Sequence, residues 1–446
     1  MKLFESRVIR QFFNLYLLYL AEETLNGIIL NIENLTLFFN YISTKNIDIN
    51  LRKSACIFLK KYIKDYWFDN TEMALTFPQK LIQDNTKEYF KTNIITLLLQ
   101  AEQSLSPLVK EMINCIIQQA EGYITIWPNL MTKLGEILNQ KNYTASTEVY
   151  DLIKKVIKRY HIEGKSRLLF AEIINTMQQI CPILTEDGLK FSKFLAENKV
   201  GTDALPCMIL LKRILQIFYS LNFQDFPEFF EDNLDKWIEI LLNCLKCTCD
   251  VPELYKPFLA LKTKTLKGVN LYFTNYFEDI QNYANQFYPV IWNLNYLVKS
   301  VDSYSGFTKE LLQFYGTNFQ YKRISNLKQE DVNALISILI LPNIKMTENE
   351  KEEFEDNPVS FLKSELQEVD LDSNKYYSIN LLKSLISLDP SLITTYINPT
   401  IQKFLSDYQA NRNKCWNDKI TAINLIFATH IKTFASRSNL FLLTFN

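Results

Sequence analysis

The sequence predicts an all-α fold, a solenoid of stacked helix pairs. Only nine glycines and 13 prolines interrupt its 446 residues, whereas Leu, Ile, Lys, Glu, Asn, Phe and Tyr dominate, a composition typical of long helices joined by short corners. It contains no alternating strand pattern flanked by turn glycines and no Gly/Ser-rich linker between independent domains. HEAT and armadillo repeats take about 40 to 47 residues each, so we expect roughly ten helix pairs.

Apolar residues recur at the spacing of amphipathic helices. The stretch Ser54 to Trp67 is the clearest case, because its apolar side chains fall at i, i+3, i+4 and i+7 while Lys53, Lys60 and Lys64 occupy the opposite face. The same pattern predicts helices over Thr92 to Leu99, Leu108 to Gln119, Val149 to Tyr160, Leu168 to Ile180, Met208 to Leu221, Leu234 to Leu245, Val332 to Leu341, Tyr376 to Leu388 and Thr421 to Phe434. Stacked pairs of such helices leave a long surface, which usually holds another protein.

The stretch from Phe218 to Trp237 holds seven aromatic and five acidic residues, with Pro227 in the middle. Core helices favour aromatic residues and solvated corners favour acidic ones, and proline interrupts a helix. The stretch therefore predicts the end of one helix, a tight corner and the start of another, at an interface between stacked helices.

Charge and hydropathy exclude several classes of protein. Lys and Arg number 48 against 49 Asp and Glu, so no global field draws the chain onto nucleic acid or anionic lipid. The apolar N-terminus carries Glu5, Arg7, Arg10 and Gln11, which indicates a packed helix rather than a signal peptide. No stretch reaches the roughly 20 apolar residues that span a bilayer. We expect a soluble protein without membrane insertion, whose eight cysteines stay reduced.

No constellation of residues points to catalysis, a cofactor or a metal. Gly164-Lys165-Ser166 resembles the end of a phosphate-binding loop, but Arg159 stands where that motif needs its first glycine, so a helix corner is favoured. Cys244, Cys247 and Cys249 could be ligands of a structural zinc site or buried thiols at a helix end. A zinc site needs four ligands and no fourth one lies nearby in the sequence, so buried thiols are favoured. The two histidines, His161 and His430, sit beside no nucleophile. We expect a protein that is not an enzyme.

The segment Thr347 to Asp356, TENEKEEFED, has six acidic residues and one lysine between two apolar helices. Two interpretations stay open. The segment is either a solvated connector, as most charged runs are, or an acidic loop that projects toward a basic partner.

Several segments together resemble the exportin-2 family of the importin-β superfamily. FYSLNFQDFPEFFEDN at Phe218 to Asn233 and the segment around Phe354 are specific to that family, and the Trp-Pro corner in IWPNLMTKL is shared widely in the superfamily. Further segments follow in the family's order: LRKSACIFLKKYIKDYW at Leu51 to Trp67, TNIITLLLQ at Thr92 to Gln100, IKRYHIEGKSRLLFAEI at Ile157 to Ile173, VIWNL at Val290 to Leu294, LPNIKMTENEKEEFEDNPVSFLKSELQEVDLDS at Leu341 to Ser373 and CWNDKITAINLI at Cys415 to Ile426.

The resemblance implies a right-handed superhelix of HEAT repeats that binds the small GTPase Ran in its GTP form together with importin-α. It implies a nuclear export receptor that returns importin-α to the cytoplasm and shuttles between nucleus and cytoplasm, with nucleoporins as further partners. Ran would dock on the first repeats and on the acidic insertion. The candidate Ran-binding residues are a basic face, Lys53, Lys60 and Lys64 with Lys61 at its edge, and an acidic insertion, Glu348, Glu350, Glu352, Glu353, Glu355 and Asp356.

The resemblance also divides the chain. Residues 1–160 resemble the N-terminal importin-β repeats with the Ran-binding region, and residues 161–446 resemble central exportin-2 repeats with the acidic insertion near 345–358. The family's chain continues well beyond Trp416, so we expect this chain to represent its N-terminal part, with an exposed apolar end from Leu440 to Phe445. The first helix is also shorter than the family's. The alternative function is a structural HEAT-repeat scaffold, truncated or degenerate, without Ran-dependent transport.

Overall fold

The structure is a computed structural model that describes residues 27–120, 122–197, 204–300, 305–324, 328–361 and 373–430. Within these ranges the chain forms helices and their connections and no β-strand. It divides into two compact units, Met1–Ile183 (unit 1) and Leu184–Asn446 (unit 2), and helix α10 (Arg167–Glu197) contributes to both. The predicted all-α fold is confirmed. The predicted first helix and the apolar end from Leu440 to Phe445 lie outside the described residues.

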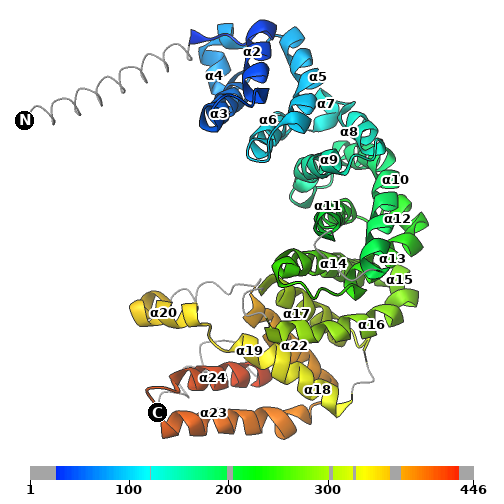
Figure 1. Cartoon of the computed structure of the whole chain (residues 1–446). Helices are drawn as coiled ribbons and strands as arrows, with labels where there is room; N and C mark the ends of the chain where they lie inside the picture. Colours follow the sequence, from blue (N-terminus) through cyan, green and yellow to red (C-terminus); the bar gives the residue numbers. More distant parts are fainter. Residues whose placement is uncertain are drawn as a thin grey trace, which may run out of the picture. The chain divides into compact units, whose positions relative to one another are not determined.

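Unit 1 is built from helix pairs whose members pack on each other. The pairs are α2 (Ile32–Ser43) with α3 (Ile49–Tyr66), α5 (Asp84–Gln100) with α6 (Ser106–Gln119), and α8 (Leu130–Asn139) with α9 (Tyr143–Ile157). The second helices of these pairs, α3, α6 and α9, also pack on one another in that order and form a row (Figure 1). Short helices fill the corners: α4 (Glu72–Thr76), η1 (Pro78–Lys80), α7 (Tyr123–Ile126) and η2 (Lys158–His161).

Unit 2 repeats this plan. Four helices pack in succession and form its row: α11 (Leu205–Asn222), α14 (Tyr255–Asn275), α17 (Ser305–Gln320) and α22 (Asn374–Leu388). Behind the row lie α13 (Leu234–Lys246), α16 (Ala284–Asn293), α18 (Gln329–Leu335) and α19 (Leu341–Ile344), and α23 (Asn398–Ala410) pairs with α24 (Trp416–His430). The remaining helices are α12 (Glu228–Asp232), η4 (Pro252–Leu254), α15 (Phe277–Ile280), η5 (Gln281–Tyr283), η6 (Leu294–Ser300) and α20 (Glu348–Asp356).

Two helices of unit 2 contain π-helical turns, η7 (Ile336–Ile340) and η8 (Ile393–Ile397). Each turn directly precedes a helix with a proline in its first two positions, Pro342 in α19 and Pro399 in α23. A proline ring clashes with the carbonyl four residues before it, and a widened turn moves that carbonyl away. The predicted single helix from Val332 to Leu341 is therefore divided into α18, η7 and the start of α19.

The stretch from Phe218 to Trp237 forms the predicted corner. Helix α11 ends at Asn222, Pro227 precedes the additional short helix α12, and α13 begins at Leu234. The buried Phe218 ring stacks on Trp237 with ring centroids 4.6 Å apart and lies edge-on to Phe230 at 5.5 Å. Aromatic contacts of this kind add to the free energy of area burial, so the corner fixes how α11 and α13 meet.

A buried lysine closes the end of α13. Lys262 on α14 is fully buried, and its Nζ donates hydrogen bonds to the carbonyl oxygens of Leu245 and Cys247, each at 2.6 Å. Burial lowers the pKa of Lys262, an effect that the nearby Cys247 and Cys244 oppose. Carbonyls at a helix end have no intrahelical donor and carry partial negative charge, so an ammonium group satisfies them.

None of the helices in the described ranges combines the length and the apolarity needed to cross a membrane.

The aromatic corner generates a stability prediction. Substituting Phe218→Ala removes a fully buried ring and leaves a cavity among Trp237, Phe230 and Tyr272, which costs about 3–5 kcal/mol. At roughly 2–4 °C per kcal/mol, thermal unfolding followed by circular dichroism should shift down by roughly 6–20 °C. The control is Phe194→Ala, because that side chain is 41% exposed and should cost far less. Equal shifts for both variants would contradict a special role for the corner.

Candidate functional site

The predicted basic face lies on α3, in the row of unit 1. Asp48 caps the start of this helix by accepting a hydrogen bond from Asn50 N at 2.8 Å. Lys53, Lys60 and Lys64 are seven and four residues apart and so share one side of the helix, whereas Lys61 is turned to its edge. Lys53 and Lys60 are half-buried, and Lys61 and Lys64 are exposed.

An exposed apolar residue lies within this basic side. Ile57 falls between Lys53 and Lys60 at helical spacing, and 53% of its surface is exposed. The opposite side of α3 is buried, with Leu59 and Ile63 fully covered. An apolar side chain surrounded by ammonium groups suits a protein partner, because the partner can bury the apolar group while its carboxylates meet the lysines.

The basic side continues onto the next helices of the row. Burial raises the pKa of the Cys115 thiol on α6, and the neighbouring Glu111 carboxylate raises it further. The positive charges of Lys60 and Lys64 on α3 and of Lys155 on α9 lower the pKa of the same thiol, so all three act on this part of the row. Lys155 also pairs with Glu111, and Gln119 Nε2 donates to the carbonyl of Lys64 at 2.7 Å.

Sequence reasoning missed Lys155 and Glu111. The three helices that carry this surface are about 50 residues apart along the chain, and only their stacking brings Lys60, Glu111 and Lys155 together. We call Lys53, Lys60, Lys61, Lys64 and Lys155 the basic face.

The acidic segment forms a helix, α20, and not an acidic loop, while the interpretation as a solvated connector between two apolar helices stays open. Helix α20 begins with a capping box, in which Thr347 Oγ1 accepts a hydrogen bond from Glu350 N at 3.2 Å and Glu350 Oε2 accepts one from Thr347 N at 2.6 Å. Thr-x-x-Glu is a helix-start signal, and it could have been recognised in the sequence.

The acidic side chains of α20 differ in their availability. The Glu350 carboxylate is engaged in the capping box, whereas Glu352, Glu353, Glu355 and Asp356 are exposed. Glu348 lies in the first turn of the helix. We call Glu352, Glu353, Glu355 and Asp356 the acidic face.

An aromatic contact holds α20 on unit 2. Phe354 stacks on Trp416 of α24 with ring centroids 5.1 Å apart, and it lies edge-on to Phe361 at 5.6 Å. The helix therefore has one anchored side and one acidic side. The basic face lies in unit 1 and the acidic face in unit 2.

The other predicted motifs have structural roles. Ser166, in Gly164-Lys165-Ser166, accepts a hydrogen bond from Leu169 N at 3.1 Å and so caps α10, as the helix-corner interpretation predicts. Cys244 and Cys247 are buried beside the Lys262 ammonium group, whose positive charge opposes a metal ion there. Among the described residues no group of three or more His, Cys, Asp or Glu could hold a metal ion.

Comparisons with known proteins match the chain to two family models and to several exportins. Residues 156–440 match the family model Cse1, and residues 21–100 match the importin-beta N-terminal domain. Exportin-2 of Oreochromis niloticus is 28% identical over 88% of this chain, and so is that of Homo sapiens. The importin-alpha re-exporter of Schizosaccharomyces pombe is 26% identical over 89%. The chain spans 41% of the length of these relatives.

A solved structure shares the fold. The structure titled "The exportin Cse1 in its cargo-free, cytoplasmic state" matches 92% of this chain, with a TM-score of 0.76 and 22% sequence identity, and 44% of that chain is covered. The match confirms the predicted α-solenoid of stacked helix pairs.

The aromatic anchor generates a prediction about α20. Phe354→Ala removes both ring contacts, each worth about 0.5–1.5 kcal/mol beyond area burial. Backbone amides of Glu348–Asp356 should then exchange with deuterium at least about fivefold faster, because local opening costs less by about 1 kcal/mol or more. Glu352→Gln is the matched control, since its side chain is exposed on the same helix. Unchanged exchange in Phe354→Ala would show that other contacts hold the helix.

Proposed function

The chain belongs to the Cse1 family, and from this we propose that it acts as a nuclear export receptor of the exportin-2 type. In this proposal it binds Ran in its GTP form together with importin-α, returns importin-α to the cytoplasm, and moves between nucleus and cytoplasm. The observation that carries the proposal is the match of residues 156–440 to the Cse1 family model. Relatives named exportin-2 and importin-alpha re-exporter, and the importin-beta N-terminal match at residues 21–100, support it.

The proposed mechanism is linked binding and requires no catalytic residue in this chain. Ran-GTP and importin-α would each stabilise the same arrangement of the helices, so each would raise the affinity for the other. Hydrolysis of GTP on Ran would remove one of the two ligands and weaken the hold on the other. A coupling free energy of about 1–3 kcal/mol corresponds to a change in affinity of roughly 5- to 150-fold.

The basic face is the proposed first contact with Ran. Its lysines would meet carboxylates on the Ran surface, and Ile57 would be buried in the contact. Lys53 and Lys60 are half-buried in the free chain, which limits the conformational entropy that their side chains lose on binding.

The acidic face is the proposed second contact. Glu353, Glu355 and Asp356 lie in the last turn of α20, and this last turn contains no basic residue. Negative charge at a helix C-terminus is unfavourable by about 0.3–1 kcal/mol per residue, because the carbonyl ends are also negative. A basic group of a bound partner would relieve this repulsion.

Titration calorimetry of the 446-residue chain tests the function. We expect Ran loaded with a non-hydrolysable GTP analogue to bind and Ran-GDP to bind at least about tenfold more weakly. Adding importin-α should strengthen Ran-GTP binding by the roughly 5- to 150-fold given above. Binding of neither form of Ran would contradict the export function and favour the structural scaffold.

Charge reversal tests the basic face. Lys60→Glu with Lys64→Glu should weaken Ran-GTP binding at least about tenfold, because two attractions become repulsions. The matched control is Lys133→Glu with Lys165→Glu, which changes the net charge equally but lies on α8 and in the corner before α10. If both double variants bind Ran-GTP like the unmodified chain, the assignment of the basic face is wrong.

Neutralisation tests the acidic face. Changing Glu352, Glu353 and Glu355 to Gln and Asp356 to Asn should weaken Ran-GTP binding and flatten its salt dependence. Thermal unfolding provides the control, because removing acids from the last turn should leave α20 equally or more stable. A weakened affinity with unchanged stability supports the contact, whereas an unchanged affinity and salt dependence contradicts it.

A further inference from the structure

The row of unit 2 concentrates positive charge. Helices α11, α14, α17 and α22 carry nine basic residues: two on α11, four on α14, one on α17 and two on α22. Glu310 on α17 is the one acidic residue in these four helices. The whole chain has a formal net charge of −1, so this row departs sharply from the average composition.

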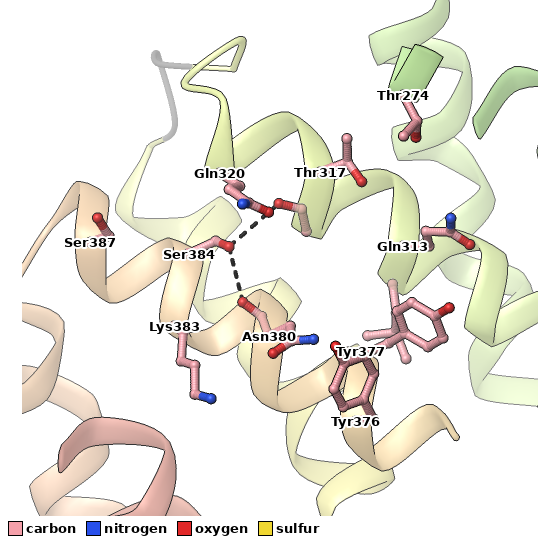
Figure 2. Close-up of a pocket in the computed structure, with 12 residues that line it drawn as sticks. Thr274, Gln313, Thr317, Gln320, Tyr376, Tyr377, Asn380, Lys383, Ser384 and Ser387 are labelled. Carbon is pink, nitrogen blue, oxygen red and sulfur yellow. Dashed lines mark hydrogen bonds between the residues drawn. The ribbon is translucent and has the colours of Figure 1, made fainter. Parts of the chain in front are cut away.

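A polar hollow of about 640 Å³ lies between α14, α17 and α22. Figure 2 shows hydroxyl and amide side chains of α17 and α22 gathered around it, among them Gln313, Thr317, Asn380 and Ser384. Ser384 Oγ donates to the carbonyl oxygens of Asn380 and Gly316, at 2.9 and 3.4 Å. The side-chain amides in this wall can both donate and accept hydrogen bonds.

A second hollow, of about 330 Å³, continues the first between α11, α14 and α17. The two share Thr274, Gln313 and Tyr377 in their walls, so together they form one groove that crosses the row. We call it the polar groove. Lys267 and Lys309 line its second half, and Lys383 lines its first half.

The single acid in the row is held inside the groove wall. Glu310 is 5% exposed, and its carboxylate accepts a hydrogen bond from Asn270 Nδ2 at 2.8 Å. Burial raises the pKa of Glu310, while Asn270 and the lysines around it act in the opposite direction. Glu310 is the one carboxylate that these four helices bring to the groove wall, where it lies with Lys267, Lys309 and Lys383.

The lysines of this region are close enough to repel one another. Burial lowers the pKa of Lys264, and the positive charges of Lys267, Lys212 and Lys309 lower it further, whereas Glu310 raises it. Lys267 Nζ also lies 4.5 Å from the centroid of the Tyr219 ring. Several ammonium groups held together in a partly dehydrated groove are stabilised when anionic groups bind between them.

We propose that the polar groove binds an extended, acidic segment of a protein partner, with carboxylates at Lys267, Lys309 and Lys383 and main-chain groups at the amides of Gln313 and Asn380. An extended peptide offers both N–H donors and carbonyl acceptors, which side-chain amides can match. The phosphate backbone of nucleic acid offers acceptors only, so the amide-rich wall favours a peptide. This inference rests on the groove in unit 2 and does not depend on Ran binding.

The row also sets the spacing of the acids in that segment. Neighbouring packed helices lie about 8–10 Å apart. A peptide in the polyproline II conformation advances about 9.3 Å in three residues and returns to the same side. An acidic residue at every third position would therefore meet Lys267, Lys309 and Lys383 on three successive helices, and a segment of about twelve residues is long enough to cross the groove.

Fluorescence anisotropy with the 446-residue chain tests the proposal. The probe is a fluorescein-labelled peptide of four Glu-Ser-Pro repeats, compared with a peptide of the same composition whose glutamates are contiguous and with a Gln-Ser-Pro version. We expect the regularly spaced probe to bind at least about fivefold more tightly than the clustered one, and the neutral one to bind weakest. Equal affinity for all three peptides would overturn the proposal.

Substitutions locate the site. Lys267→Gln with Lys309→Gln should weaken binding of the spaced probe at least about tenfold, and Gln is chosen because its aliphatic stem preserves part of the packing. The control is Lys246→Gln with Lys256→Gln, two lysines of unit 2 that do not line the groove. Thermal unfolding of each variant shows whether it is still folded. Lys383→Gln is a milder change at the other end of the groove, and it should weaken binding of the spaced probe by itself. Unchanged binding in the folded groove variants would overturn the proposal.

A nucleic-acid probe distinguishes the other class of ligand. A fluorescein-labelled single-stranded oligonucleotide of equal negative charge should bind more weakly than the spaced peptide. Tighter binding of the oligonucleotide, lost in the Lys267 and Lys309 variant, would show that the groove holds nucleic acid instead.

Discussion

Each helix of this chain must bury its apolar stripe against the helices that follow it, and the rest of the structure depends on this constraint. A helix in a stack contacts the partner in its own pair and the equivalent helix of the next pair, as α3 contacts α2 and α6. Its remaining side stays open. Open sides of successive helices lie next to one another, so side chains far apart in the sequence form one surface. Lys60 and Lys155 act on the same Cys115 thiol for this reason.

Buried polar groups determine how neighbouring helices meet. Arg159 pairs with the fully buried Glu172 and with Glu163, and Glu172 also accepts a hydrogen bond from Ile124 N at 3.2 Å. Lys262 likewise joins α14 to the end of α13. Such groups add little net stability compared with apolar residues of the same size, but losing one partner costs about 3–5 kcal/mol. A packing that separated these partners would therefore be disfavoured, which gives each corner one arrangement.

Local patterns made part of this fold predictable. The helical spacing in Ser54 to Trp67 and the aromatic and acidic mixture around Pro227 each depend on residues close in sequence, and both predictions are confirmed. Helix α14 was not among the predicted stretches, because it is packed against α11, α13 and α17 and its buried residues are not confined to one narrow apolar stripe. The capping box of Thr347 and Glu350 was missed in the sequence, because the segment was interpreted from its acidic charge alone. The basic face beyond α3 and the polar groove depend on stacking, which no local pattern encodes.

The charge distribution is consistent with the proposed function, in which partners are bound and released repeatedly. The chain has 48 basic and 49 acidic residues, but they are distributed unevenly: unit 2 has a basic row, and α20 has an acidic face. Charges separated by more than about 8 Å are largely screened at physiological salt, so each patch acts on its own partner group rather than through a global field. Contacts between such patches speed association, and exposed ion pairs add only about 0–1 kcal/mol each to affinity. In the proposed function, tight binding would then require several patches to be engaged at once, and removing one ligand would weaken the hold on the other.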